Sequence, residues 1–185
     1  MRIILAITAA SGAIYARQIA DLLLESEQVE QIALVYSRSA REVMSHEDEY
    51  IAEHERITIY DNDDMFAPIA SGSARYEAMI VAPCSVGTLA RVASGYADTL
   101  ITRAADVMLK ERRRLVLVLR ESPLSLVHLR NMVALAEAGA IVMPASPSFY
   151  MGADSVEALA ATISSRAVAM VGIDGGVKAW DGKKI

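Results

Sequence analysis

Short apolar segments alternate with longer segments in which apolar residues recur every three or four positions, and this pattern continues along almost the whole chain. The short segments have the length and the continuous hydrophobicity of strands that are buried on both sides of a sheet. The longer segments have the periodicity of helices with one apolar face. Because strands and helices that alternate in this way form right-handed βαβ units, we predict an α/β fold in three layers, with a parallel sheet and helices on both of its faces.

The limits of these elements follow from the same pattern and from turn and capping residues. The predicted strands are Ile3–Thr8, Ile32–Tyr36, Ile57–Tyr60, Met79–Ala82, Leu115–Leu119 and Ile141–Met143. The predicted helices are residues 13–26, 38–45, 85–93, 100–110 and 124–138, followed by a last helix that Asp154 caps and that ends near Val171. Residues 61–74, with the sequence DNDDMFAPIASGSA, are expected to form a loop.

One domain is expected over residues 1–185, because the chain is long enough for a substantial core and shows no repeat, linker or low-complexity segment. From about residue 172 three glycines precede Trp180. We expect this carboxyl-terminal tail to be mobile or to lie on a neighbouring subunit.

The apolar content changes this picture in one respect. Hydrophobic residues make up 54% of the chain and the mean hydropathy is +0.30, which is high for a soluble monomer. Part of the surface is therefore expected to close against other copies of the same chain.

No apolar run approaches the length of a membrane span. The opening IILAITAA is short and leads into a loop and a helix, so we interpret it as a buried first strand and not as a signal peptide.

Charge and cysteine content exclude several classes of function. The formal net charge is −5 and the isoelectric point is about 5.2, so there is no overall basic field for nucleic acid, despite the local cluster Arg112–Arg114. Cys84 is the only cysteine, which rules out an intramolecular disulfide and fits a reducing cytoplasm. The three histidines have no metal-ligand spacing, so no metal is expected. Cys84 has no evident base, and we interpret it as a small buried residue.

The segment RAADVMLKERRRLVLVLRE, residues 103–121, combines cations with an available carboxyl group. Arg103 and Lys110 are seven positions apart and would lie along one face of a helix. Arg120 and Glu121 would emerge at the carboxyl end of the strand Leu115–Leu119, the edge at which open α/β sheets bind their ligands. This arrangement favours an anionic substrate and a proton transfer. The alternative is a solvated basic helix with surface ion pairs.

Small and hydroxyl-bearing residues follow three of the predicted strands. They occur in the turn Thr8–Ala13, at Ser37 and in the turn Pro83–Thr88. Small residues let a ligand approach the backbone, and the start of the following helix offers free N–H groups to a phosphate. The turn Thr8–Ala13 is not the G-x-G-x-x-G motif, so a dinucleotide fingerprint is absent. Together the three exits predict a groove for a phosphate and a planar ring, with ordinary tight turns as the alternative.

Several motifs in order along the chain identify a family that it resembles. They are TAASGAIYA, APIASGS, APCSVGTLA, TRAADVMLKERR, RESPLSLVHLRNM and the PSFY before the last helix. This set resembles the UbiX-type flavin prenyltransferases, formerly described as phenylacrylic acid decarboxylases, over nearly the whole chain.

The resemblance implies a Rossmann-like or flavodoxin-like fold, a large homo-oligomer (often a dodecamer) and catalysis without a metal. It implies transfer of a dimethylallyl group from dimethylallyl phosphate to N5 and C6 of reduced FMN, which builds a fourth ring. The prenylated FMN would then serve a UbiD-type decarboxylase, including those of ubiquinone biosynthesis.

Site residues are carried over from the resemblance position by position. The implied FMN contacts are Ala9, Ala10, Ser11, Ser37, Ser85, Val86, Gly87, Thr88 and Arg120. The implied dimethylallyl phosphate contacts are Tyr150 and Arg166, with Arg103 and Lys110 from a neighbouring part of the assembly and Trp180 in the tail. Glu121 would transfer protons, Glu47 would be a second acid, and Ser11, Lys110 and Tyr150 would also take part in catalysis.

The chain departs from the family pattern at Ala9, Arg114, Met151 and Ala179, where glycine, proline, histidine and arginine are common. These departures affect contacts around the phosphate and the tail, and none removes an implied catalytic residue. Three other functions stay open: an FMN-dependent cysteine decarboxylase, a non-catalytic subunit that binds and delivers flavin, and a flavodoxin-like electron carrier. The first would need a histidine in an early helix and an Asn-rich loop, which we do not find.

Overall fold

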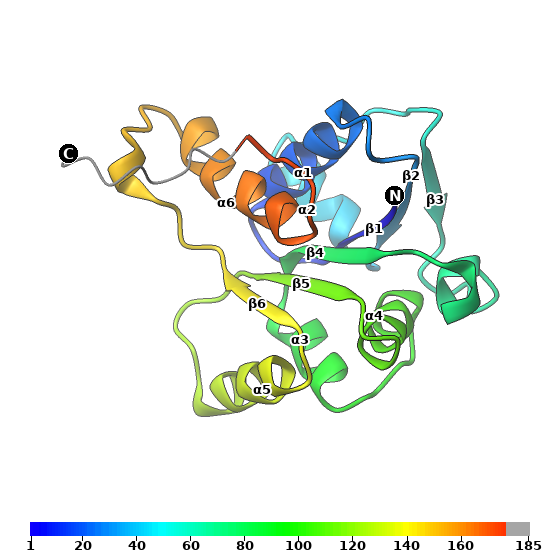
Figure 1. Cartoon of the computed structure of the whole chain (residues 1–185). Coiled ribbons are helices and arrows are strands. Elements are labelled where there is room, and N and C mark those ends of the chain that lie inside the picture. Colours follow the sequence, from blue (N-terminus) through cyan, green and yellow to red (C-terminus); the bar gives the residue numbers. More distant parts are fainter. Residues whose placement is uncertain (177–185) are drawn as a thin grey trace.

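A six-stranded parallel sheet forms the centre of the molecule (Figure 1) in the computed structural model, which describes residues 1–176. The strands are β1 (Arg2–Ile7), β2 (Gln31–Tyr36), β3 (Ile57–Tyr60), β4 (Ala78–Cys84), β5 (Arg114–Leu119) and β6 (Ile141–Pro144). Their order across the sheet is β3-β2-β1-β4-β5-β6, and every pair of neighbours is parallel. The predicted parallel α/β sheet is therefore confirmed, in the strand order of the Rossmann fold.

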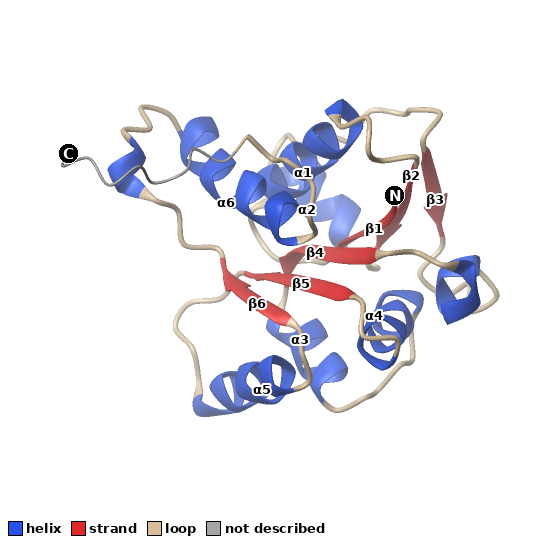
Figure 2. Ribbon diagram, viewed as in Figure 1, coloured by secondary structure: helices blue, strands red, loops and turns tan. Residues whose placement is uncertain are grey.

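Helices cover both faces of this sheet, as Figure 2 shows. They are α1 (Ala13–Glu25), α2 (Ala40–His46), α3 (Val86–Ala93), α4 (Leu100–Lys110), α5 (Leu126–Glu137) and α6 (Val156–Met170). Helices α1, α2 and α6 pack on one face, and α3, α4 and α5 pack on the other. Alternate residues of each strand enter the two cores: Ile3, Leu5 and Ile7 face α1, whereas Ile4 and Ala6 face the opposite layer.

The strand order reverses between β1 and β4, and in open α/β sheets ligands bind outside the carboxyl ends of the strands at such a point. Thr8, just after the end of β1, forms hydrogen bonds with the residues at the end of β4. Its hydroxyl donates to the carbonyl of Pro83 at 2.8 Å and accepts from the backbone N–H of Ser85 at 2.8 Å. Thr8 is only 2% exposed, so these bonds hold the first residues of both exit loops in fixed positions.

Several boundaries differ from the sequence predictions. Strand β4 continues through Cys84, and Ser85 caps α3 without belonging to it. The expectation that Asp154 caps the last helix is wrong: Ser155 is the cap, and its hydroxyl accepts from the N–H of Ala158 at 3.2 Å. A hydroxyl at the first non-helical position reaches that N–H directly, whereas a residue one position earlier lies outside the turn.

The loop predicted over residues 61–74 contains two short 3-10 helices, Pro68–Ala70 and Gly72–Ala74.

Cys84 is fully buried, and burial raises the pKa of its thiol to about 12, so its interpretation as a small buried residue is confirmed. Trp180 and Ala179 lie outside the described residues. Within residues 1–176, no helix is both long enough and apolar enough to cross a membrane.

Candidate functional site

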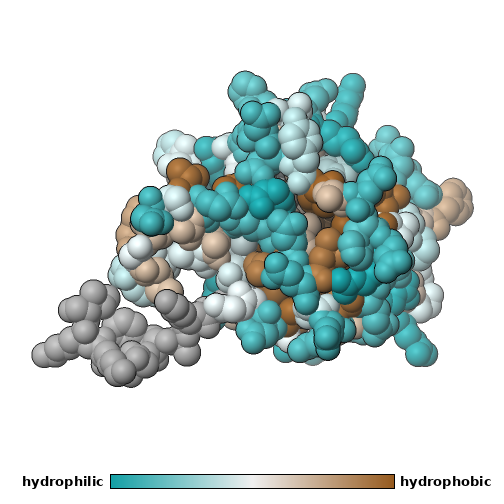
Figure 3. Space-filling view, turned by 90° about the horizontal axis from the view of Figure 1, so that it is seen from above, coloured by the Kyte–Doolittle hydropathy of each residue, from teal (hydrophilic) through white to brown (hydrophobic). Residues whose placement is uncertain are grey.

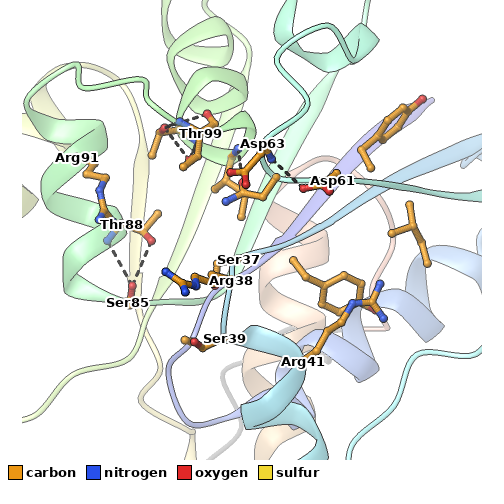
Figure 4. A pocket seen from close by; sticks show the side chains of 17 residues that line it. Ser37, Arg38, Ser39, Arg41, Asp61, Asp63, Ser85, Thr88, Arg91 and Thr99 are labelled. Carbon is orange, nitrogen blue, oxygen red and sulfur yellow. Dashed lines mark hydrogen bonds between the residues drawn. The ribbon is translucent and has the colours of Figure 1, made fainter.

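A cavity of about 910 Å³ opens at the carboxyl edge of the sheet, beside the exits of β1, β2, β3 and β4 (Figure 4). Ala9, Ser37, Ser85 and Thr88, four of the predicted FMN contacts, line it together. They come from three separate strand exits, so the predicted groove is present. Its volume lies within the range of about 300–1,000 Å³ that is usual for small-molecule and cofactor sites.

The amino terminus of α3 forms one wall of this cavity. The Ser85 hydroxyl accepts from the N–H of Thr88 at 3.3 Å and contacts the Thr88 hydroxyl at 3.2 Å (Figure 4). The N–H groups of Val86 and Gly87 are in the first turn, where a helix supplies no acceptor of its own. A Cβ built on Gly87 would meet only the Arg91 side chain, at 4.0 Å. This wall therefore offers donors and open space to a phosphate.

Cationic residues that the sequence interpretation missed also line the cavity: Arg38, Arg41 and Arg91. The Arg41 guanidinium lies 4.0 Å from the centre of the Tyr36 ring, a cation–π contact that holds this cation at the exit of β2. Burial raises the pKa of the Tyr36 phenol, and the charge of Arg41 opposes that rise. The segment SRSAR, which follows β2 directly, is the sequence signal that could have identified Arg38 and Arg41, whereas Arg91 lies in α3 outside it.

Glu47 caps the amino terminus of α1 from a distant part of the chain. Gly12 has φ = 102°, and its N–H donates to both Glu47 carboxylate oxygens at 2.9 and 3.1 Å, while the N–H of Ala13 donates at 2.7 Å. Partial burial alone would raise the pKa of Glu47, but hydrogen bonds from Ser11, Ala13 and Gly12 and the charge of Arg120 lower it below its ordinary value. Glu47 is therefore an ionised carboxylate at neutral pH.

Arg120 lies at the same edge of the sheet as Glu47. Its backbone N–H donates to the carbonyl of Cys84 at 3.0 Å, which fixes it at the end of β5. Burial raises the pKa of the Tyr15 phenol, Arg120 lowers it and Glu47 raises it, so the phenol lies within reach of both charges. Tyr15 was missed by the sequence interpretation. Glu121 follows Arg120, and its carboxylate accepts from the N–H of Ser122 at 3.1 Å.

Arg103 and Lys110 do not line the cavity. Arg103 donates to the carbonyl of Ala70 at 3.0 Å and to Asp106 at 2.8 Å. Lys110 ends α4, just before β5 begins, and its ammonium group lies 2.6 Å from Glu111. Since the amino end of β5 is the opposite edge of the sheet, Lys110 and the cavity of the same chain face different sides of the molecule.

The segment that leads into Tyr150 contacts the face of α6 that carries Arg166. Tyr150 belongs to the 3-10 helix Phe149–Met151, and the N–H of Ser148 just before it donates to the Thr162 hydroxyl at 3.1 Å. Thr162 and Arg166 are four positions apart in α6 and so share one face of the helix. Neither Tyr150 nor Arg166 lines the cavity of its own chain. Trp180, the remaining predicted contact, is beyond residue 176.

Comparisons with known proteins agree with this geometry. Residues 1–169 match the model of the family described as Flavoprotein. The chain is 44% identical over 184 residues to the flavin prenyltransferase UbiX of Thermoplasma acidophilum, an alignment that covers 97% of this chain and 100% of the relative.

Two solved structures are similar to this chain over nearly its whole length. A crystal structure of AnUbiX (PadA1) in complex with FMN and dimethylallyl pyrophosphate is 42% identical, with a TM-score of 0.90, and the match covers 99% of this chain and 98% of that one. A dodecameric FMN-dependent UbiX-like decarboxylase from Escherichia coli O157:H7 is 38% identical, with a TM-score of 0.92, over 98% of this chain and 100% of that one.

Proposed function

Because the chain belongs to the UbiX family of flavin prenyltransferases, we propose that it transfers a dimethylallyl group from dimethylallyl phosphate to N5 and C6 of reduced FMN. The observation that carries this proposal is the arrangement at the carboxyl edge of the sheet. There the exits of β1, β2 and β4 line one cavity, and Ser11, Glu47 and Arg120 come together beside it. Reduced FMN is a substrate of this reaction, since the reaction modifies it.

The cavity wall formed by α3 supports binding of the flavin phosphate. Ser85, Thr88 and the first N–H groups of α3 supply neutral donors, and Ser37 supplies another hydroxyl from the exit of β2. Ala9, Ala10 and Ser11 form the turn above β1, where small side chains let a planar ring approach the backbone. Arg120 adds a cation that acts on Glu47, the carboxylate that caps this turn.

Dimethylallyl phosphate would be held by Tyr150 and Arg166, with Arg103 and Lys110 from a neighbouring copy. As the allylic C–O bond breaks, the phosphate leaves with the electron pair, and these cations and the phenol stabilise its charge. The allyl fragment would be sheltered from water by the flavin and the aromatic side chain. Arg103 does not line the cavity of its own chain, and Lys110 lies at the other end of α4, near the start of β5, which supports a site shared between copies.

Glu121 is proposed to accept and return the proton that the second bond, at C6, requires, since it emerges beside Arg120 at the same edge. Glu47 has a different role. Its pKa is lowered by the donors of the α1 turn and by Arg120, so it stays ionised and holds the turn that carries Ser11.

A homo-oligomer, by analogy a dodecamer, is proposed as the working form. The face over α1, α2 and α6 is mainly hydrophilic (Figure 3). On the other side of the sheet, α5 exposes apolar residues: Leu126 is 61% exposed, Val127 63% and Val133 57%. Such a helix face needs a partner, and a further copy of the chain is the simplest one. The prenylated FMN would pass to a UbiD-type decarboxylase in the cytoplasm.

One experiment tests the reaction. The protein is incubated without oxygen with reduced FMN and dimethylallyl phosphate, and the flavin is then analysed by mass spectrometry. The expected product is a flavin heavier by one prenyl unit. Recovery of unaltered flavin would contradict the proposal and would favour the alternative, a subunit that binds and delivers flavin without changing it. Release of CO₂ from a peptidyl cysteine would favour the cysteine decarboxylase instead.

A further inference from the structure

The short segment that carries Tyr150 has little apolar support within its own chain. Phe149 is 76% exposed, Tyr150 is 62% exposed and Met151 is 41% exposed. Side chains this exposed contribute little burial energy, so the segment depends on polar contacts for its position.

Helix α6, next to this segment, is by contrast firmly attached to α1. The Gln18 amide donates to the carbonyl of Glu157 at 3.0 Å, and the buried Ser164 hydroxyl donates to Gln18 at 2.9 Å. The Arg17 guanidinium also pairs with the carboxylate of Glu157. These contacts make α6 a fixed element against which a neighbouring segment can be held.

Thr162 provides that connection. Its hydroxyl accepts from the backbone N–H of Ser148 at 3.1 Å and donates to the carbonyl of Leu159 at 2.7 Å. The bond to Leu159 uses the hydroxyl proton, so the oxygen lone pairs remain for Ser148. Thr162 precedes Arg166 by one helical turn, so the bond places the start of the Tyr150 segment over the face that carries Arg166.

We propose that Thr162 is a positioning residue for the prenyl donor: its hydroxyl holds the segment of Tyr150 over the face of Arg166, so that the two side chains meet one phosphate group. Thr162 touches no substrate itself and acts through Tyr150. This inference rests on the proposed function.

The test compares Thr162→Val with Thr162→Ser. Valine keeps the shape of the side chain and removes the acceptor, whereas serine keeps the hydroxyl. Because the net value of one such hydrogen bond is about 1 kcal/mol, we expect Thr162→Val to lower kcat/KM for dimethylallyl phosphate by about 5-fold. Thr162→Ser should retain wild-type kcat/KM, and the Kd for FMN should stay unchanged in both, since Thr162 does not line the FMN cavity.

A double-mutant cycle separates positioning from a general loss of structure. Adding Thr162→Val to Tyr150→Phe should cause no further loss, because the bond acts only through the Tyr150 hydroxyl. Thr58→Val in β3 is the matched control: it removes another threonine acceptor, which takes a bond from Gln31 at 3.2 Å far from α6. This control should leave kcat/KM unchanged.

Failure of the inference and failure of the proposed function have different signatures. If the wild-type protein forms no prenylated flavin, the proposed function is wrong. If the wild-type protein is active and Thr162→Val matches it, or if the losses from Thr162→Val and Tyr150→Phe are additive, the positioning role is wrong. An increase in the Kd for FMN equal to the loss in kcat/KM would also overturn it.

Discussion

Glu47 is the residue whose role changes most between sequence and structure. In the sequence it lies in the polar run HEDEYIAEHE, which is typical of a solvated segment, and only the family resemblance singled it out. In the fold its carboxylate accepts hydrogen bonds from the N–H groups at the start of α1, a helix that begins more than thirty positions earlier in the sequence. Periodicity reports which face of an element is buried, but it carries no information on which distant side chain caps a helix.

The lowered pKa of Glu47 predicts a pH effect on stability. A carboxyl group whose pKa is lower in the folded state stabilises the fold above its unfolded pKa, and that contribution disappears as the pH falls through the folded value. Glu47→Gln should therefore lower the free energy of unfolding at pH 7 by about 1 kcal/mol or less, in the range of a lost helix cap. Between pH 5 and pH 3, roughly the carboxyl titration range, wild type should lose more stability than Glu47→Gln. Urea unfolding across this range measures both, and equal acid losses would contradict the assignment.

Gly12 gives a second prediction at the residue scale. At φ = 102° an L side chain is strained, and a Cβ there would lie 2.7 Å from Cε2 of the Tyr15 ring. Gly12→Ala should lower the free energy of unfolding by about 2 kcal/mol or more, from backbone strain and displacement of the ring. Gly95→Ala is the control, because Gly95 has φ = 70° and open space around it. Equal losses in the two variants would show that Tyr15 does not press on the turn.

The limits of helices and strands were predicted more accurately than the contacts between distant side chains. The strand Ile57–Tyr60 and the helix Leu100–Lys110 have the predicted limits, because runs of continuous hydrophobicity or helical period define them locally. Errors occur at termini such as Asp154, where two capping residues are adjacent in sequence. The three exit loops were predicted to meet, since parallel strands share an edge. The cations beside them, such as Arg41, were missed because a basic residue after a strand is usually a solvated one.

The Ser85 cap of helix α3 gives a testable prediction for a single element. Ser85 caps it and also lines the cavity, whereas Ser125 caps α5 in the same way and does not line it. Ser85→Ala and Ser125→Ala should each cost about 1 kcal/mol of folding stability. Only Ser85→Ala should also weaken FMN binding, by roughly 5-fold, since it removes a hydroxyl donor from the cavity wall that α3 forms. Fluorescence titration of FMN distinguishes the two, and equal affinities would contradict a role for α3.

At the scale of the whole molecule, the two groups of candidate residues face opposite edges of one sheet. Ser11, Glu47 and Arg120 lie at the carboxyl edge, and Lys110 lies at the end of α4 near the start of β5. A single chain therefore offers the proposed flavin-binding residues at one edge of the sheet and a cation at the other. In the proposed homo-oligomer, repetition of the chain in a closed assembly would bring these two sets of residues together.

Subunit complementation tests this arrangement. Lys110→Ala and Glu121→Gln should each reduce prenylation by 100-fold or more, on the order of a lost transition-state donor. Mixed oligomers of the two variants should recover part of the wild-type rate, since some sites receive Lys110 from one variant and Glu121 from the other. The rate is measured after co-expression and after mixing without subunit exchange. If co-expression gives no recovery, the two residues serve the same copy.

The burial of Cys84 has a practical consequence for following such an assembly. The sequence holds one thiol, and it is fully enclosed and protonated at neutral pH. Alkylating reagents attack thiolates that they can reach, so the folded chain gives them no native target. A cysteine introduced at an outward position such as Phe66, which is 100% exposed, would carry the only dye or cross-linker on each copy. Distances between copies can then be measured without first removing a natural thiol from the core.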